Sequence, residues 1–173
     1  QLYRMYGVVY FNQERYRDAI TAFETQLKQD GISERDRNDT MFTLAQLRFQ
    51  IEDWKGAIKI LEDWLAVVDN PPPEPYVMLG SAYYQLDRFA EVIEPVETAI
   101  RIARERDKEV KERWWLLLRA GYYEINNLKK VTEILEILVV NWPKKDYWTM
   151  LSGMYGELNQ EKRQLATYEA AYD

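Results

Sequence analysis

An apolar pattern recurs five times along this chain of 173 residues. Each copy opens with a large apolar residue and has a second apolar residue three positions later, and four copies place a small residue directly after it. The copies open at Tyr3, Met41, Tyr76, Trp115 and Trp148, so they follow one another at nearly equal intervals. Five registers at nearly one period indicate a structural repeat.

Each copy contains two helical segments. Its apolar residues recur at spacings of three and four, which is typical of a helix face and not of a strand. Short polar breaks, such as residues 126–127, separate the two segments, and breaks with glycine or proline, such as residues 70–75, separate the copies. Since proline and glycine end helices, these breaks predict helix stops. The second helix of the third copy is predicted to be long and to bend at Pro95.

Small residues predict where the two helices of a hairpin approach closely. In the first segments these residues are Gly7, Ala45, Gly80 and Ser152, and in the second segments they include Ala19 and Ala57. A single hairpin cannot bury its whole apolar surface, whereas stacked hairpins can, so the pattern predicts a solenoid. The alternative is an unrelated helical bundle with accidental periodicity.

The order aromatic-x2-Leu-Gly-x2-Tyr, then Ala-x3-Phe and Pro, resembles the tetratricopeptide repeat over essentially the whole chain. The resemblance implies an all-α fold, a right-handed α-solenoid of about five stacked helix-turn-helix repeats. In a single array over residues 1–173, the approximate repeats are 1–33, 38–70, 73–107, 112–144 and 145–173. Arg48 departs from the pattern at a tyrosine position, and Arg119 at a small one. Because the chain starts inside an amphipathic stretch without a methionine, we expect a fragment of a longer protein.

The C-terminal tail carries a second resemblance. Residues 142–155 and 165–172 are similar to bacterial tetratricopeptide proteins described as components of TonB energy-transduction systems. This likeness implies an accessory role in TonB-dependent uptake, typically iron transport, in the periplasm of a Gram-negative cell.

Composition removes most of the usual catalytic groups. The chain has no cysteine and no histidine, so thiol nucleophiles, zinc–thiolate sites and the common neutral-pH base are absent. Its net charge of −6 disfavours a nucleic-acid partner. No apolar run reaches the length of a membrane-spanning helix. We predict that the protein is not an enzyme and has no catalytic residues, cofactor or metal site.

Helix geometry predicts which side chains line the groove of such an array. In the third copy, Tyr76, Leu79 and Tyr83 form the packing stripe, and the positions one residue later lie about 100° around the helix. Carried through four copies, this register gives a ladder of aromatic rings flanked by amide and apolar groups. The predicted groove residues are Arg4, Phe11, Asn12, Phe42, Phe49, Gln50, Val77, Tyr84, Gln85, Leu116, Tyr123 and Glu124. The alternative is that each ring packs against the adjacent repeat.

The groove predicts a protein or peptide partner with an apolar or amphipathic segment, held by shape and apolar burial. A clamp for a terminal carboxylate is not predicted, because the groove offers only Arg4 and Asn12 for it. The alternative function is a structural or oligomerisation module that self-associates through the groove or through an apolar N-terminal face. That face contains Leu2, Met5, Tyr6 and Val9.

Overall fold

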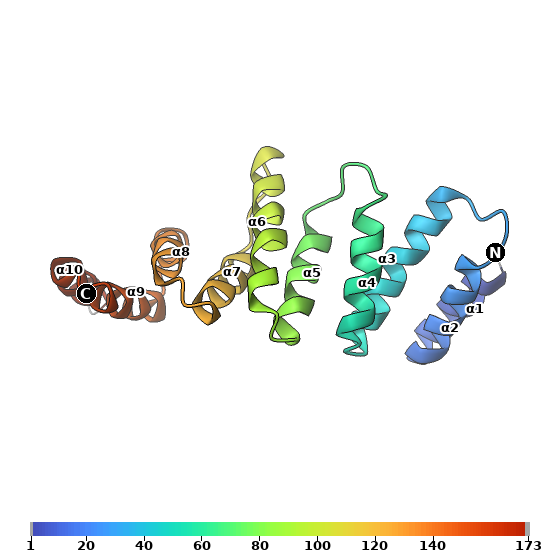
Figure 1. Cartoon of the computed structure of the whole chain (residues 1–173), viewed down its shortest axis with the longest axis horizontal. Helices are drawn as coiled ribbons and strands as arrows, with labels where there is room; N and C mark the ends of the chain where they lie inside the picture. Colours follow the sequence, from blue (N-terminus) through green and yellow to red (C-terminus); the bar gives the residue numbers. More distant parts are fainter. Residues whose placement is uncertain (1, 172–173) are drawn as a thin grey trace. The chain divides into compact units, whose positions relative to one another are not determined.

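The computed structural model describes residues 2–171, and in this range it contains ten α-helices and no strand (Figure 1). Tyr172 and Asp173, which the fifth predicted repeat includes, lie outside the described residues. The chain forms two compact units, residues 1–86 and 87–173. The helices are α1 (Leu2–Asn12), α2 (Tyr16–Leu27), α3 (Glu34–Gln50), α4 (Trp54–Leu65) and α5 (Glu74–Gln85) in the first unit, then α6 (Phe89–Glu105), α7 (Glu112–Glu124), α8 (Leu128–Asn141), α9 (Lys145–Glu157) and α10 (Glu161–Ala170) in the second.

The turn after each first helix has the same backbone conformation in all five copies. One residue of the turn has a left-handed φ between 56° and 60°. Side chains other than glycine adopt this region at a cost, and asparagine and aspartate tolerate it best. These residues are Glu14, Glu52, Asp87, Asn126 and Asn159, which follow one another at the spacing of the apolar pattern. All five fall in polar breaks that were predicted to stop a helix, so that prediction is confirmed.

The small residues lie at close helix contacts, as predicted. A Cβ atom at Gly7 would lie only 2.6 Å from the Cζ atom of Phe23, so a larger residue at this position of α1 would require the Phe23 ring of α2 to move. Ala45 of α3 and Ala57 of α4 are fully buried. Within the units, these contacts join α1 to α2, α3 to α4, α7 to α8 and α9 to α10.

Successive hairpins pack through a second contact. The second helix of one repeat touches the first helix of the next, which joins α2 to α3 and α4 to α5 in the first unit, and α6 to α7 and α8 to α9 in the second. Leu44 and Leu61 are fully buried in the first unit, and Leu135 and Leu138 are buried in the second. The chain is therefore an all-α fold of stacked helical hairpins.

Two helices are longer than the others. Helix α3 has 17 residues and begins at Glu34, before the predicted repeat start at residue 38, because the Ser33 side chain accepts a hydrogen bond from the Asp36 amide at 3.1 Å and so caps the helix. Helix α6 also has 17 residues and contains Pro95. The predicted long second helix of the third copy is therefore confirmed.

Candidate functional site

One polar side-chain contact recurs between successive repeats and holds neighbouring hairpins together. In repeats two to five, a residue near the end of the first helix bonds to a glutamate on the second helix of the preceding repeat. The pairs are Arg48–Glu24, Tyr83–Glu62, Tyr122–Glu97 and Tyr155–Glu136. Tyr122 donates to Glu97 Oε1 at 2.5 Å and Tyr155 donates to Glu136 Oε1 at 2.6 Å. We call these four pairs the inter-repeat bridges.

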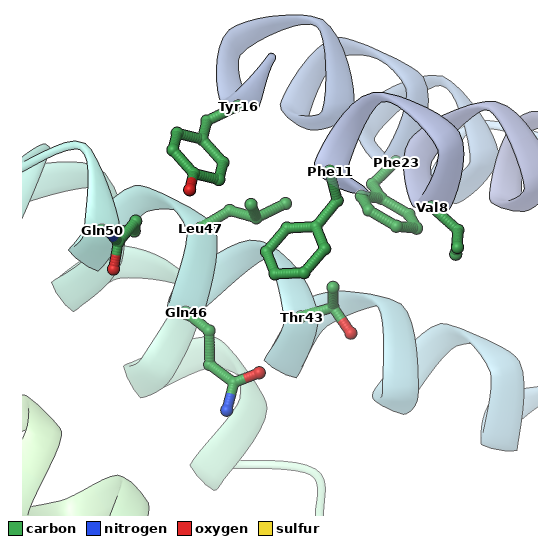
Figure 2. Close-up of a pocket in the computed structure, with 8 residues that line it drawn as sticks. All are labelled: Val8, Phe11, Tyr16, Phe23, Thr43, Gln46, Leu47 and Gln50. Carbon is green, nitrogen blue, oxygen red and sulfur yellow. The ribbon is translucent and has the colours of Figure 1, made fainter. Parts of the chain in front are cut away.

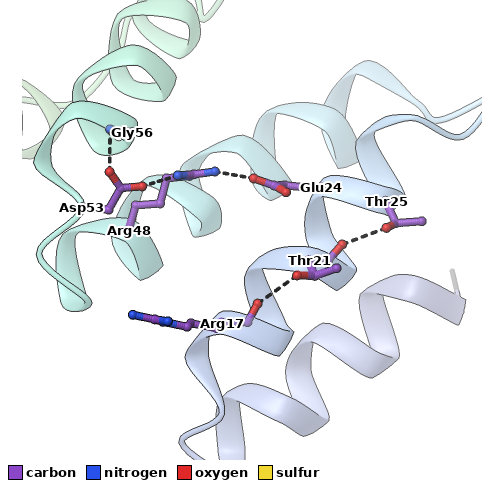
Figure 3. Close-up of polar contacts among 7 residues, drawn as sticks. All are labelled: Arg17, Thr21, Glu24, Thr25, Arg48, Asp53 and Gly56. Carbon is purple, nitrogen blue, oxygen red and sulfur yellow. Dashed lines mark hydrogen bonds and ion pairs between the residues drawn. The ribbon is translucent and has the colours of Figure 1, made fainter.

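The second repeat builds its bridge from arginine in place of tyrosine. The guanidinium of Arg48 in α3 lies between the carboxylates of Glu24 in α2 and Asp53, and it bonds to both (Figure 3). Asp53 also accepts a hydrogen bond from the Gly56 amide at 3.0 Å, which caps α4. Arg48 therefore ties three helices together, and its departure from the repeat pattern keeps the bridge instead of breaking it.

The bridges change the titration of their tyrosines. Burial, aided by the hydrogen bond to Glu97, raises the pKa of Tyr122 above its ordinary value, and burial with the bond to Glu136 raises the pKa of Tyr155. The folded protein therefore holds these phenol protons where the unfolded chain releases them. The resulting stability is fully present below the unfolded pKa of about 10 and is lost as the pH rises above it.

We expect the free energy of unfolding to fall as the pH is raised above about 10, and the Tyr122→Phe variant to show a shallower fall. Phenylalanine keeps the ring and removes the titrating hydroxyl. Urea unfolding followed by circular dichroism at a series of alkaline pH values measures both slopes. An unchanged slope in the variant would contradict the role of Tyr122.

An open pocket of about 510 Å³ lies in the first unit, between the α1–α2 hairpin and α3. Its lining residues are Val8, Phe11, Tyr16, Phe23, Thr43, Gln46, Leu47 and Gln50. We call it the α1–α3 pocket. Figure 2 shows the Phe11 ring projecting from α1 towards α3, near Leu47 and Thr43.

The pocket has an apolar side and a polar side. Phe23 and Leu47 are buried, so they provide a fixed apolar floor, while Val8 and Phe11 are each about half exposed on α1 (46% and 49%). On α3, the exposed amides of Gln46 and Gln50 supply both hydrogen-bond donors and acceptors. Among the described residues, none that lines the pocket is charged. Such a surface suits apolar side chains together with an uncharged polar backbone.

Two of the predicted groove residues, Phe11 and Gln50, line the pocket. Arg4 lies elsewhere on α1 and pairs with Asp36 at 3.0 Å, and Asn12 is exposed at the end of α1. Apart from Phe42 and Phe49 of α3, the other predicted residues are divided between α5 and α7. Val77, Tyr84 and Leu116 are partly buried there, and Gln85, Tyr123 and Glu124 are exposed.

Two predicted groove rings instead take part in packing within their own hairpin. The ring of Phe42 lies 5.1 Å from that of Trp64, and the ring of Phe49 lies 4.8 Å from that of Trp54 in an edge-on contact. Both tryptophans belong to α4, the partner helix of α3. The predicted alternative of packing therefore applies to these rings, against the same hairpin and not the adjacent repeat.

The sequence-based prediction of the groove missed the other six lining residues, which are Val8, Tyr16, Phe23, Thr43, Gln46 and Leu47. Thr43 lies one position after the predicted ring Phe42, and Gln46 lies one helical turn before the predicted Gln50. Phe49 stands five residues before Trp54, just as Phe11 stands five residues before Tyr16. The ring of Phe11 lies 5.9 Å from that of Tyr16, so the spacing marks a ring pair that spans the turn of a hairpin.

Residues 2–171 contain no group of three or more acidic side chains placed to hold a metal ion. None of the helices in this range combines the length and apolarity that crossing a bilayer requires.

The fold and the pocket define a helical-hairpin repeat protein with an open pocket between its first two hairpins. One of its hairpins carries a known sequence pattern, since residues 73–106 match the tetratricopeptide repeat family. No curated protein matches the sequence.

Solved structures extend this likeness to the whole chain. A crystal structure of MamA is 20% identical, covers 96% of this chain and 92% of its own, and has a TM-score of 0.74. MamA 41-end from Desulfovibrio magneticus RS-1 is 14% identical, covers 99% and 92%, and has a TM-score of 0.72. YrrB, described as a TPR protein with an unusual peptide-binding site, is 12% identical, covers 98% and 82%, and has a TM-score of 0.74. The chain therefore has a tetratricopeptide-type fold.

Proposed function

We propose that this chain is a non-catalytic interaction scaffold that binds a peptide or an amphipathic helix in the α1–α3 pocket. The observation that carries the proposal is the pocket itself, in which half-exposed apolar side chains face exposed amides across a buried apolar floor. The volume of about 510 Å³ lies within the range of sites that hold a few side chains of a ligand. The description of YrrB as a peptide-binding TPR protein supports the same class of ligand.

Apolar burial supplies the affinity in this proposal. A ligand side chain that enters beside Phe11 covers apolar surface that is now exposed to water, and each square ångström removed from water contributes about 25 cal/mol. The floor formed by Phe23 and Leu47 is already packed, so the protein loses little conformational entropy on binding.

The amides provide orientation. Gln46 and Gln50 stand one helical turn apart on α3, so their side chains can follow a ligand backbone and pair with its N–H and C=O groups. Because the described lining of the pocket contains no Lys or Arg, we infer that a free terminal carboxylate is not the recognised feature. The ligand is an internal segment with apolar anchors.

The test starts from a random display library of twelve-residue peptides selected against the full chain. We expect the selected peptides to carry two or more apolar residues, and we expect Phe11→Ala to weaken their binding about tenfold, since about 1.4 kcal/mol of apolar contact is a tenfold change. Fluorescence anisotropy of a labelled selected peptide gives the Kd.

Val140→Ala is the matched control, because Val140 is an apolar side chain of α8 that is 78% exposed and lies outside the pocket. Its Kd should equal that of the unmodified chain. Selected peptides that bind the Phe11→Ala variant with unchanged affinity would refute the pocket as the binding site.

An accessory role in a TonB system stays a prediction, as do iron transport and the periplasmic location. All three depend on the likeness of residues 142–155 and 165–172.

A further inference from the structure

Gln26 occupies a position in α2 that later repeats fill with apolar side chains. The residues at the same position in repeats two to four are Trp64, Ala99 and Leu138. All three are buried, and Gln26 is also buried, since it is only 5% exposed. The first repeat therefore places a side-chain amide where the next three repeats place apolar groups.

The carbonyl oxygen of this amide has no partner. The Oε1 atom of Gln26 is buried and accepts no hydrogen bond within residues 2–171. A buried polar atom without a partner costs free energy, and an apolar side chain of similar size would avoid that cost. Leu138 is such a side chain at the corresponding position of α8, where it is 0% exposed. Packing alone therefore does not account for the glutamine.

Gln26 lines an open pocket of about 300 Å³ in the first unit. The pocket lies where the end of α2 and the segment that follows it meet the first turns of α1 and α3. We call it the Gln26 pocket. Because the last torsion of a glutamine side chain is broad, the amide of Gln26 can turn its oxygen towards a ligand in this pocket.

The pocket also carries a carboxylate that is not neutralised. Two of its other charged residues, Arg4 and Asp36, form an ion pair at 3.0 Å, and Ser33 Oγ donates a further hydrogen bond to Asp36 at 2.8 Å. Asp30 is exposed, and its side chain makes no hydrogen bond or ion pair within residues 2–171. A buried acceptor and a free carboxylate together favour a cationic hydrogen-bond donor.

We propose that the Gln26 pocket binds a primary ammonium group, with Gln26 Oε1 accepting one of its N–H groups and the Asp30 carboxylate balancing its charge. An ammonium group has three donors and no acceptor, so it supplies what both side chains lack. It is more compact than a guanidinium, which suits a single buried acceptor. The group belongs either to a lysine side chain of a partner protein or to a free alkylamine. The site is separate from the α1–α3 pocket and does not depend on peptide binding there.

The test compares two cations of equal charge. Butylammonium chloride is the probe, and tetramethylammonium chloride is the control because its cation has no N–H donor. Both are titrated into the isotope-labelled chain, which is followed by proton–nitrogen correlation NMR. We expect butylammonium to shift the side-chain amide signals of Gln26, which are identified by their absence from the Gln26→Leu variant, and the backbone amide signal of Gly31 in the pocket. Tetramethylammonium should leave the Gln26 signals in place.

The source of the ammonium group is distinguished by a second probe, N-acetyl-lysine N-methylamide. This compound carries the lysine side chain between two peptide groups. We expect it to shift the same signals as butylammonium. If it binds more tightly than butylammonium, the site recognises a lysine of a partner protein, and if it binds less tightly, the site recognises a free alkylamine.

Two variants test the assigned groups. Gln26→Leu should weaken butylammonium binding, followed at Gly31, about tenfold, since it removes a hydrogen bond to a charged group. Its urea unfolding midpoint should equal or exceed that of the unmodified chain, because leucine leaves no polar atom unsatisfied. Asp30→Asn should weaken binding about threefold at low salt, as expected for an exposed ion pair. Asp146→Asn, which changes an exposed carboxylate of α9 outside the pocket, should leave binding unchanged.

Three results would overturn the proposal. The first is a titration in which butylammonium does not shift the Gln26 signals. The second is an equal shift by tetramethylammonium, which would show that charge alone attracts the cation. The third is a folded Gln26→Leu variant that binds butylammonium as tightly as the unmodified chain does.

Discussion

Replacing Trp114 with alanine is expected to lower the free energy of unfolding by about 3–5 kcal/mol. Trp114 lies in the first turn of α7 and is only 1% exposed, which makes it the largest side chain so completely buried in the described residues. The substitution removes its apolar contacts and leaves a cavity, and both effects destabilise the fold. Urea unfolding followed by circular dichroism gives the free energy without depending on tryptophan fluorescence.

Trp114→Phe separates the ring from the rest of the indole. The indole N–H of Trp114 is buried and has no hydrogen-bond partner within residues 2–171, so phenylalanine keeps an aromatic ring and removes a polar group that is not satisfied. We expect its loss of stability to be less than half that of the alanine variant. Equal losses in the two variants would show that ring burial is not the main contribution.

The second large effect is expected from Arg48→Ala, which should lower the free energy of unfolding by about 1.5–3 kcal/mol. The variant loses both charge-assisted bonds of Arg48, to Glu24 and to Asp53, and leaves two carboxylates without their shared cation. Because the arginine is only partly buried, the difference should shrink at high salt. Thermal and urea unfolding at low and high salt measure it.

The control is Arg48→Tyr, which restores the residue type of the other bridges. Tyrosine can donate to Glu24 as Tyr83 donates to Glu62, while Asp53 keeps its cap on α4. We expect this variant to stay within about 1 kcal/mol of the unmodified chain. A loss of stability as large as that of Arg48→Ala would mean that tyrosine cannot replace arginine in this bridge.

The sequence was sufficient to predict the fold class and the hairpins. Periodic apolar residues and turn breaks are local signals, and they placed the helix stops near residues such as Glu52 and Asn126 correctly. The start of α3 was less predictable, because Ser33 and the charged residues after it suit a helix cap and a loop alike.

The site was less predictable than the fold. A register says which positions share a helix face, but an error of one residue turns the face by about 100°. The rings of Phe42 and Phe49 contact tryptophans of α4, whereas Phe11 and Gln50 of the same predicted set line the pocket. Only the contacts between helices show which positions on a helix are already covered by a neighbouring helix.

The bridges were not predicted, although their sequence signal is complete. Glu24, Glu62, Glu97 and Glu136 follow one another at the same intervals as the residues that open the first four copies of the apolar pattern. A glutamate on a helix surface is usually solvated, so its recurrence in the sequence does not by itself predict a contact. The contact becomes evident only when the structure shows a tyrosine bonded to it. Arg48 departs from the repeat pattern in the sequence, and only its bond to Glu24 shows that it replaces tyrosine in a bridge.

The bridge partners are separated by only 19 to 25 residues along the chain. During synthesis, the acceptor glutamate of each bridge leaves the ribosome shortly before its donor, and no later segment is needed to complete the contact. Each new hairpin of a nascent chain can thus pack on the preceding hairpin while the rest of the chain is still being translated. We therefore expect a chain stalled on the ribosome to carry folded, protease-resistant repeats.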